Sequence, residues 1–359
     1  MSLETLLPSR LEAIEAELRR AIGSQRAHHT QYLARRGPAG PGDAHPLSTD
    51  DLRDYYAMLE YHLGWNGGGS AAGGGKRIRP LLCLLACEAA GGDWRQALPV
   101  AAAIELIHNF SLIHDDIQDN SPLRRGRPTV WTKWGQAQAI NAGDAMFTLA
   151  HLAPQRLSEV GVAPAITLSV LAELNYTSLE LTQGQYLDMA FEQRPSVTVM
   201  EYLAMIEKKT AVLIATATYL GATVAGASPE CLDHYYAFGW NLGLAFQLQD
   251  DLLGIWGDPA VTGKSAASDL EKRKKSLPVV FGLERLPPFA EAYAKPHTAG
   301  EPVTELADML EEIGARAEGE RRAHETTLCA ETELAKSQPT GPAAIALSEL
   351  TQQLLHRNM

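Results

Sequence analysis

The sequence predicts an all-α protein that folds as a single large helical bundle. Through most of the chain, apolar residues recur every three or four positions, which is the spacing of one helix face. The periodic segments are long and are separated by short polar breaks, whereas no alternating run is strong enough to indicate a sheet. The chain has 359 residues, of which 45% are hydrophobic, so it can bury one large core.

The first expected element is a charged amphipathic helix over residues 3–35, which a Gly- and Pro-rich stretch then breaks. The segment 48–51 offers an N-cap for a second helix. After it, the Gly-rich stretch GWNGGGSAAGGG leads into the basic cluster KRIRP. Further helices are expected over the remaining periodic segments, at 81–90, 96–118, 135–157, 164–191, 198–226, 229–256, 275–285, 303–329 and 341–357.

The balance of charge indicates small molecules or metal ions as partners. The formal net charge is −12, which argues against a nucleic-acid binder, because phosphate backbones require a basic face. The four cysteines form no CxxC pair, which fits a reducing compartment. Of these, Cys83 and Cys87 share one helix face and are expected to pack in the core.

Two stretches bear on where the protein resides. The first 23 residues carry acids and a helical period where a signal peptide would need an unbroken apolar stretch, so the protein is expected to be cytoplasmic. Residues 211–227, AVLIATATYLGATVAGA, are uncharged and nearly long enough to span a bilayer. Their Thr and Gly content and short length favour a helix that is buried on all sides and does not span a membrane.

Three carboxylates are packed into the segment HDDIQD, which ends a strongly apolar helix. Asp119 lies one turn beyond Asp115 and Asp116, so the three side chains converge at the end of the expected helix. Hard oxygen ligands of this type suit Mg²⁺, which is usually shared between carboxylates and substrate phosphates. Taken alone, one such motif is more often a solvated helix end.

A second acidic helix end occurs in LAFQLQDDLLGIWGD. Asp250 and Asp251 follow the apolar part of this helix, Gln247 lies one turn before them, and Gly254 stands where a third acid could follow. Two helices of this kind, facing each other, would hold a diphosphate between them through bridging metal ions. The presence of both patches favours a metal and diphosphate site over a coincidence.

Basic residues accompany both acidic patches. Arginine forks match phosphate oxygens in a bidentate manner, whereas lysine contributes a compact charge. The glycines before Lys76 allow the backbone to approach an anion closely. The alternative is a positively charged loop that holds surface acids. The two clusters are Lys76, Arg77 and Arg79 in GGGKRIRP, and Arg124, Arg125 and Arg127 in LRRGRP.

These motifs, in this order, resemble the trans-isoprenyl diphosphate synthases, also called polyprenyl synthetases. The resemblance covers residues 50–357 and rests on GGGKRIRP, IHNFSLIHDDIQDNSPLRRGRPT, GQYLDM, KKTAVLI, FQLQDDLLGIWGD and TGK…KKSLP. It implies the all-α isoprenoid synthase fold, a helical bundle around a deep central cavity, usually as a homodimer. It also implies an enzyme that uses Mg²⁺ to join isopentenyl diphosphate, head to tail, to an allylic diphosphate.

The resemblance also implies the domain organisation and the site. Residues 51–359 are the expected catalytic domain, and residues 1–50 are an N-terminal extension, helical or partly disordered, without a counterpart in the resemblance. The metal ligands implied are Asp115, Asp116, Asp119 and Asp250, with Asp251 beside them. The implied isopentenyl diphosphate pocket is Lys76, Arg79, His108 and Arg125. The implied contacts to the allylic diphosphate are Arg124, Lys209, Thr210, Gln247, Lys264 and Lys274. The four metal-binding acids, Arg124 and Lys209 form the expected catalytic group.

For His108 the alternative is a purely structural role, because a lone histidine in an apolar helix is more often a buried residue with satisfied hydrogen bonds. Its place two turns before Asp115, on the same helix face, favours a functional role.

In the family that the chain resembles, bulk four and five residues before the first acidic motif sets the product length. Here these residues are Ser111 and Phe110, and one small and one large residue resemble geranylgeranyl diphosphate synthases of the archaeal type. At about 100° per residue, Ser111 lies nearly beneath Asp115, whereas Phe110 is turned well aside. Farnesyl and longer products therefore stay open.

Two functions of other classes are weighed against chain elongation. A class I terpene cyclase shares the fold and an aspartate-rich motif, but it would not need the isopentenyl pocket of Lys76, Arg79 and His108. A catalytically silent partner subunit would be expected to lack acids of the first motif, and none is missing here. Gly254 departs from the second motifs that carry a third aspartate.

Overall fold

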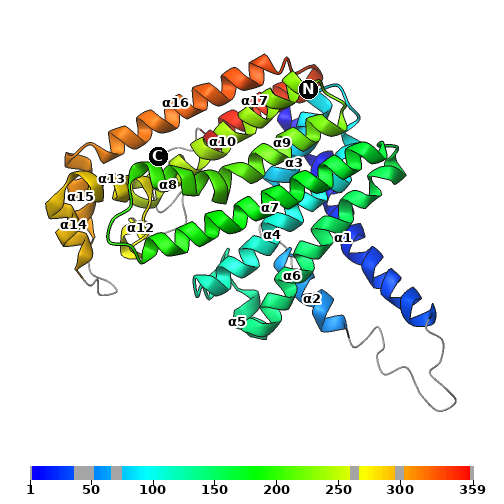
Figure 1. Ribbon diagram of the computed structural model, residues 1–359, viewed down its shortest axis with the longest axis horizontal. Helices are drawn as coiled ribbons and strands as arrows, with labels where there is room; N and C mark the ends of the chain where they lie inside the picture. The colour runs from blue at the N-terminus through cyan, green and yellow to red at the C-terminus, as the bar shows by residue number, and fades with distance from the viewer. Residues whose placement is uncertain (1, 36–51, 66–74, 259–266, 296–302, 356–359) are drawn as a thin grey trace, which may run out of the picture.

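The computed structural model describes residues 2–35, 52–65, 75–258, 267–295 and 303–355, and the side chains of 25–35 and 268 lie outside this description. Helices account for nearly all of these residues, as the periodicity predicts (Figure 1). In chain order the elements are α1 (Leu3–Arg35), α2 (Arg53–His62), α3 (Ile78–Ala89), η2 (Trp94–Ala97), α4 (Leu98–Gln118), β1 (Leu123–Arg124), β2 (Arg127–Pro128), α5 (Val130–Trp134), α6 (Gln136–Leu152), η3 (Ala153–Val160), α7 (Pro164–Glu192), α8 (Val199–Ile206), η4 (Glu207–Ala211), α9 (Val212–Val224), α10 (Pro229–Trp256), α12 (Ser268–Glu271), α13 (Leu277–Arg285), α14 (Pro287–Ala294), α15 (Thr304–Glu312), α16 (Ala315–Lys336) and α17 (Gly341–Leu355).

The centre of the bundle is built on α4 and α9. Helix α4 packs against α3 and α6, and α9 packs against α3 and α10 (Figure 1). Nearly every residue of α9 is buried, including the hydroxyls of Thr216 and Thr218. The expectation that residues 211–227 form a helix buried on all sides is therefore confirmed over Val212–Val224.

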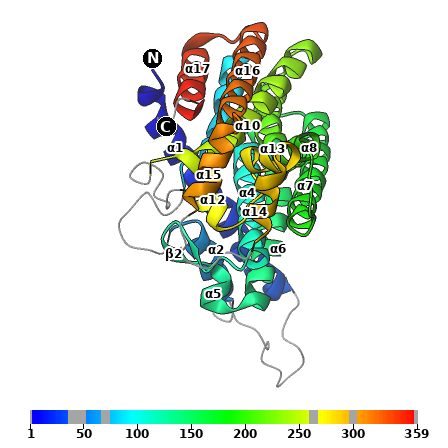
Figure 2. The same cartoon turned by 90° about the vertical axis from the view of Figure 1, so that its left-hand side faces the viewer.

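The apolar side chains form two clusters. The larger one joins α1, α2, α3, α4, α6, α9 and α17 with parts of α7 and α10. The smaller one lies at the end of the bundle where α8, α12, α13, α14 and α15 meet the last turns of α10 (Figures 1 and 2). The two acidic motifs of the sequence lie at the C-terminal ends of α4 and α10, and the last turns of α10 belong to the smaller cluster.

Helix α1 covers the range that the sequence predicts and belongs to the bundle. Its apolar stripe, with Ile14, Leu18 and Ile22, is buried in the larger core. It contacts α3, α4 and α17. The backbone N–H of Leu3 also donates to a carboxylate oxygen of Glu349 in α17 at 2.6 Å. The first part of the N-terminal extension is thus held by hydrophobic burial, in the manner of a core helix.

Three features differ from the expected pattern. The described residues contain a two-stranded hairpin, β1 with β2, which is too short to show alternation in the sequence. Its turn residues Arg125 and Gly126 both have positive φ, 52° and 72°, as in a type I′ hairpin turn. The helix expected over 303–329 is divided into α15 and α16 at Gly314, whose φ is 76°. The short helices α5, α12 and α14 were not expected.

One helical stretch in the described part of the chain, Trp94–Gln118, has the length and hydropathy of a membrane span. Of its most apolar window, 72% is buried inside the protein. A central helix of a bundle has the same properties.

Candidate active site

The end of α4 places the first acidic motif. Asn120 adopts the left-handed conformation, with a φ of 50°, and the N–H of Ser121 donates to the carbonyl of Asp116 at 2.9 Å. This is the hydrogen-bond pattern that stops an α-helix through a left-handed residue. Asp116 is buried, Asp115 is half-buried and Asp119 is exposed. The three carboxylates therefore surround the point at which the chain leaves α4.

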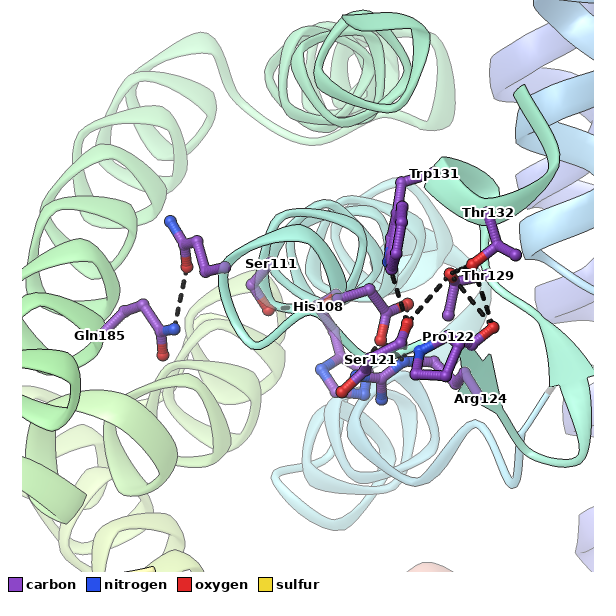
Figure 3. Close-up of polar contacts among 11 residues, drawn as sticks. His108, Ser111, Ser121, Pro122, Arg124, Thr129, Trp131, Thr132 and Gln185 are labelled. Carbon is purple, nitrogen blue, oxygen red and sulfur yellow. Dashed lines mark hydrogen bonds and ion pairs between the residues drawn. The ribbon is translucent and has the colours of Figure 1, made fainter. Parts of the chain in front are cut away.

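The hairpin that follows α4 carries the arginines back onto this helix end (Figure 3). The carbonyl of Ser121 accepts from the indole N–H of Trp131 at 2.9 Å and from the hydroxyl of Thr129 at 3.1 Å. These bonds fix the start of the hairpin, and Arg124 then reaches Asp116. Its Nε lies 2.9 and 3.0 Å from the two carboxylate oxygens, and its Nη2 lies 2.9 Å from one of them. Burial raises the pKa of Asp116, and Arg124 opposes this rise.

Of the three acids in the first motif, Asp115 has the carboxylate whose ionised form its surroundings destabilise most. Burial raises the pKa of its carboxyl to about 6. The nearby carboxylates of Asp119 and Asp188 add to this rise, whereas Lys209 and Arg124 oppose it. Because like charges converge here in partial burial, a bound cation would stabilise the ionised form. This is the chemistry expected of a metal-binding carboxylate.

Lys209 is presented by a π-helical turn, η4, which lies between α8 and α9. This turn packs directly on α7, and a Cβ on Gly184 would lie only 2.4 Å from the backbone nitrogen of Lys209. The Lys209 ammonium donates to the carboxylate of Asp188, also on α7. Beside them, Gln185 faces α4 and donates to the Oε1 of Gln118 at 2.9 Å (Figure 3). A π-helical turn of this kind is often found at functional sites.

A chain of hydrogen bonds leads from η4 into the second acidic motif. The hydroxyl of Thr210 donates to the Oε1 of Gln247 at 3.0 Å, and the Nε2 of Gln247 donates to Asp251 at 3.0 Å. The fully buried Asp251 also accepts from the backbone N–H of Leu277 at 3.0 Å and from the hydroxyl of Tyr202. The Asp251 carboxylate therefore links α8, α10 and α13, and the structure brings Thr210 and Gln247 together.

Asp250, the neighbour of this buried acid, belongs to the open side of the site. Its negative charge acts on both Arg79 and Lys274, so Asp250 lies near both of these basic side chains. Desolvation lowers the pKa of Lys274, but the carboxylates around it prevail and raise this pKa above its usual value. These carboxylates are Asp251, Asp269, Asp188 and Asp250. Lys274 therefore stays protonated next to the second motif.

The structure explains why residue 254 is a glycine. A Cβ at this position would lie 2.3 Å from an oxygen of the Asp269 carboxylate, which comes from α12. Asp269 is buried, at 6% exposure. The space beside the third position of the second motif is thus filled by an acid from another element, and only glycine leaves room for it.

A second basic group lies around His108 of α4. The Nη1 of Arg79 is 3.2 Å from the Nε2 of His108. Because arginine can only donate, this nitrogen accepts, and the proton of the imidazole is on Nδ1. Burial lowers the pKa of His108 well below its usual range, and the charges of Arg79, Arg125 and Arg124 lower it further. Arg125 lies against Gly75, since a Cβ on Gly75 would be 2.6 Å from its guanidinium.

His62, at the end of α2, joins this basic group and was missed in the sequence. Burial lowers its pKa to about 3, with further contributions from Arg124, Arg125, Arg77 and Arg127. It lines a small pocket with Arg124 and Arg125. No motif marks His62, because the residues around it in the sequence show only an ordinary helical period. Asp188 was also missed, although the motif GQYLDM that contains it was noticed.

The residues expected to limit chain length lie on two sides of α4. Phe110 is buried, and its ring packs edge-on against Phe147 of α6, with 5.1 Å between centroids. Phe147 in turn lies 4.4 Å from the ring of His151. The hydroxyl of Ser111 bonds back to the carbonyl of His108 at 2.9 Å. Phe110 thus packs towards α6, whereas the hydroxyl of Ser111 turns back onto its own helix.

The predicted site residues fall into two adjoining groups. The first group gathers the acids around Lys209 and Lys274, and the second gathers Arg79, His108 and Arg125. Lys76 is exposed beside the second group. The predicted contact Lys264 lies outside the described residues.

The donor set fits a magnesium ion that is shared with a substrate. Within the described ranges, no three His, Cys, Asp or Glu side chains are grouped closely enough to hold a metal alone. Mg²⁺ usually takes one or two carboxylates and completes its shell with water and substrate phosphate oxygens. Asp115 and Asp119 on α4 offer oxygen ligands of this type, and the raised pKa of Asp115 indicates a carboxylate that a cation would stabilise.

Comparison with known proteins gives consistent matches. Residues 69–312 match the family model described as polyprenyl synthetase. A (2E,6E)-farnesyl diphosphate synthase of Mycobacterium tuberculosis is 46% identical over 253 residues, covering 67% of this chain and 68% of that protein. A geranylgeranyl diphosphate synthase of the same organism is 38% identical over 337 residues, covering 92% of this chain and 95% of its own length.

The fold agrees with a solved structure across the whole chain. The geranylgeranyl pyrophosphate synthase of Corynebacterium glutamicum, complexed with isoprenyl diphosphate and magnesium, superimposes with a TM-score of 0.79 at 27% identity. The match covers 98% of this chain and 99% of that one. The all-α bundle described above is therefore the isoprenoid synthase fold.

Proposed function

The chain belongs to the polyprenyl synthetase family and is a trans-prenyltransferase, and we propose that it elongates allylic diphosphates to geranylgeranyl diphosphate. In this proposal the enzyme joins isopentenyl diphosphate, head to tail, to dimethylallyl, geranyl and farnesyl diphosphates in turn. The alternative within the same chemistry is a farnesyl or longer product, because curated relatives carry both names.

One observation carries the proposal, namely that two groups of polar side chains with different composition adjoin each other, and each suits a diphosphate in a different way. In the first, carboxylates from α4 and α10 face the ammonium groups of Lys209 and Lys274. In the second, Arg79 and His108 form a basic group without a carboxylate in direct hydrogen-bond contact among the described contacts. A reaction between two diphosphates needs one site that activates its diphosphate and another that only binds it. A single-substrate cyclase would need only the first.

Asp115, Asp116, Asp119 and Asp250 are the residues that would hold Mg²⁺ with the allylic diphosphate. Bound there, the metal would stabilise negative charge on the departing diphosphate. The donor chemistry of the site and the magnesium complex of the Corynebacterium protein support this assignment. Asp116 also holds Arg124, so its carboxylate has a second task at the same diphosphate.

The protein's own residues supply the rest of the mechanism. Lys209, Lys274 and Arg124 place positive charge where the diphosphate leaves, so that the allylic C–O bond breaks heterolytically and a carbocation forms. Lys76, Arg79, His108 and Arg125 hold isopentenyl diphosphate with its double bond beside that cation, which is a proximity effect. The double bond attacks that cation and forms the new C–C bond. The released diphosphate then takes up the proton that the resulting cation loses, which regenerates an allylic diphosphate. Apolar walls around the chain exclude water, which would otherwise trap the cation as an alcohol.

The proposed product length rests on Phe110 and Ser111. Phe110 is buried and packs against Phe147. In this proposal its ring would block one side of the path of the growing chain, and the small Ser111 would leave space below Asp115. This combination suits a product longer than one with two bulky residues at these positions.

We further propose that the protein is a cytoplasmic homodimer. Large apolar side chains are exposed at helical spacing along α7, and α6 adds two more, which favours burial against a second copy of the chain. A charged substitution such as Leu179→Glu should shift the mass seen by light scattering from two chains to one; an unchanged mass would contradict this interface. The exposed residues are Ile140, Phe147, Leu168, Tyr176, Leu179 and Tyr186.

Product analysis tests the proposed function. Purified protein is incubated with Mg²⁺, isopentenyl diphosphate and each of dimethylallyl, geranyl and farnesyl diphosphates, and the dephosphorylated products are separated by chromatography. We expect geranylgeraniol from all three starters. A shorter or longer alcohol would retain the reaction and overturn the assignment of Phe110 and Ser111. Cyclised hydrocarbon, or no product from any starter, would overturn the proposed function itself.

A further inference from the structure

Glu15, on the N-terminal helix α1, makes two short hydrogen bonds to residues that flank the Gly-rich stretch of the sequence. Its Oε1 accepts from the Nε of Arg77 at 2.7 Å, and its Oε2 accepts from the indole N–H of Trp65 at 2.7 Å. The guanidinium of Arg19, also on α1, lies 4.3 Å from the Trp65 ring centroid. One carboxylate of α1 therefore binds the chain both before and after residues 66–74.

Arg77 is the residue through which this contact reaches the substrate site. Its side chain is only 2% exposed and has two acidic partners, Glu15 and Glu105 of α4, the latter at 2.7 Å. It also donates to the carbonyl of Leu63 at the end of α2, at 3.0 Å. Through one guanidinium, α1, α2 and α4 are joined to the start of α3.

The backbone at Arg77 has an unusual conformation that these contacts maintain. Arg77 has a φ of 48° and is the residue immediately before α3. A non-glycine residue in this left-handed region is strained and persists only where its surroundings hold it. Lys76 and Arg79, which are proposed to bind isopentenyl diphosphate, lie on either side of this turn. Their directions therefore depend on how firmly Arg77 is held.

We propose that Glu15 is a positioning residue for the isopentenyl diphosphate pocket, so that helix α1 serves substrate binding. It acts through Arg77, and it does not touch the substrate. The inference rests on the proposed function, because it assumes that Lys76, Arg79 and His108 bind isopentenyl diphosphate. It assigns a purpose to a helix that has no counterpart in the sequence motifs.

Electrostatics distinguishes this role from simple packing. Glu15 is one-third exposed at its side chain, so its removal costs little hydrophobic burial. Removal of the Glu15 carboxylate takes away one of the two acidic hydrogen-bond partners of the buried Arg77 guanidinium, and Glu105 remains as the other. The fold should therefore survive, whereas the turn at Arg77 should loosen. The affinity for isopentenyl diphosphate should therefore fall, whereas the affinity for the allylic diphosphate should stay unchanged.

The test compares Glu15→Ala and Glu15→Gln with Glu12→Ala, which removes an exposed acid from the same helix one turn earlier. Steady-state kinetics gives the KM for isopentenyl diphosphate and for farnesyl diphosphate separately, and calorimetry measures binding of isopentenyl diphosphate alone. We expect Glu15→Ala to raise the KM and the dissociation constant for isopentenyl diphosphate roughly three- to tenfold. The KM for farnesyl diphosphate should stay at the value of Glu12→Ala. The melting temperature should fall by only a few degrees, because Glu105 still pairs with the buried Arg77 guanidinium. Glu15→Gln should show the same selective change, since Arg77 and Trp65 donate to different carboxylate oxygens and the amide replaces one of them with an NH2 group that cannot accept.

Two results would overturn the inference. If the KM for isopentenyl diphosphate were unchanged in both Glu15 variants, Glu15 would have no influence on the pocket. If both KM values and the melting temperature moved together, Glu15 would be a general structural residue. A wild-type protein that fails to condense the two substrates would instead count against the proposed function, and the binding measurement keeps the two failures distinguishable.

Discussion

Arg124, on the hairpin, forms an ion pair with Asp116 at the end of α4, and its Nε donates to the two carboxylate oxygens at 2.9 and 3.0 Å. This pairing means that an acid of the first motif and an arginine of the basic cluster act as one unit. We therefore expect Asp116→Ala and Arg124→Ala to be non-additive, with a coupling energy of about 1 to 3 kcal/mol in kcat/KM. A double-mutant cycle measured with farnesyl diphosphate checks this. Additive losses would show that the two side chains act separately.

The aromatic contact between Phe110 and Phe147 leads to a prediction about product length. Phe110→Ala should lengthen the product, because the ring closes one side of the path beneath Asp115. Phe147→Ala should act in the same direction, since its ring supports Phe110. Chromatography of the prenyl alcohols measures both. Tyr236→Ala removes a ring that packs elsewhere, against Trp240, and serves as control. If Phe110→Ala left the product unchanged, the floor of the cavity would lie at other residues.

The contact between Gly254 and Asp269 predicts that restoring a third aspartate is harmful here. In Gly254→Asp, the new Cβ would meet the Asp269 carboxylate and bring a second negative charge beside a buried one. We expect unfolding to become easier by about 2 kcal/mol or more. Urea denaturation measures the change, with Gly254→Ala as the control that adds only the methyl group. A Gly254→Asp protein as stable as the wild type would mean that Asp269 moves away at little cost.

His62 gives the protein a pH dependence of known sign. In the folded state its pKa is lowered to about 3, whereas its ordinary value is 6.5. Below pH 6.5 the unfolded chain therefore binds a proton at His62 that the folded chain does not, so stability falls as the pH falls towards 3. Between pH 7 and pH 5 this histidine should account for about 1 to 2 kcal/mol of lost stability.

The comparison of wild type with His62→Gln isolates this contribution. Urea unfolding at pH 7 and pH 5, in buffer without phosphate, should show a smaller loss of stability in the variant. Equal losses in the two proteins would indicate that His62 is not held neutral among the arginines.

Much of the fold was predictable because long helices leave a strong period in the sequence. The range of α1 follows from that period, and the burial of Val212–Val224 follows from an uncharged composition with Thr and Gly and from a length too short for a membrane span. The hairpin at Arg124–Arg127 was not predictable in this way, because two-residue strands have no period. The break at Gly314 was also missed, since one glycine does not by itself end a helix.

The residues of the candidate site could be predicted where they belong to a sequence motif. They could not be predicted where their role depends on contacts between residues that are far apart in the sequence. Asp115 and Asp250 could be proposed as ligands because an acidic pair occurs at the end of two apolar helices, and the two patches together favour a metal and diphosphate site. The buried Asp251 carboxylate joins three helices through hydrogen bonds from Tyr202 and Leu277, which are distant from it in the sequence. Likewise, no pattern connects Glu15 with Arg77, which lie 62 residues apart.

The central claim is that the carboxylates of the first motif bind the metal that activates the allylic diphosphate, and Asp115→Ala tests it most directly. The ionised form of Asp115 is held at pH 7 against burial and against Asp119 and Asp188, so its removal should not lower the melting temperature. The exposed Asp233→Ala on α10 is the matched control. We predict that turnover with Mg²⁺, isopentenyl diphosphate and farnesyl diphosphate falls about a thousandfold or more in Asp115→Ala and stays unchanged in the control. A folded Asp115→Ala protein with a turnover near that of the wild type would contradict the claim.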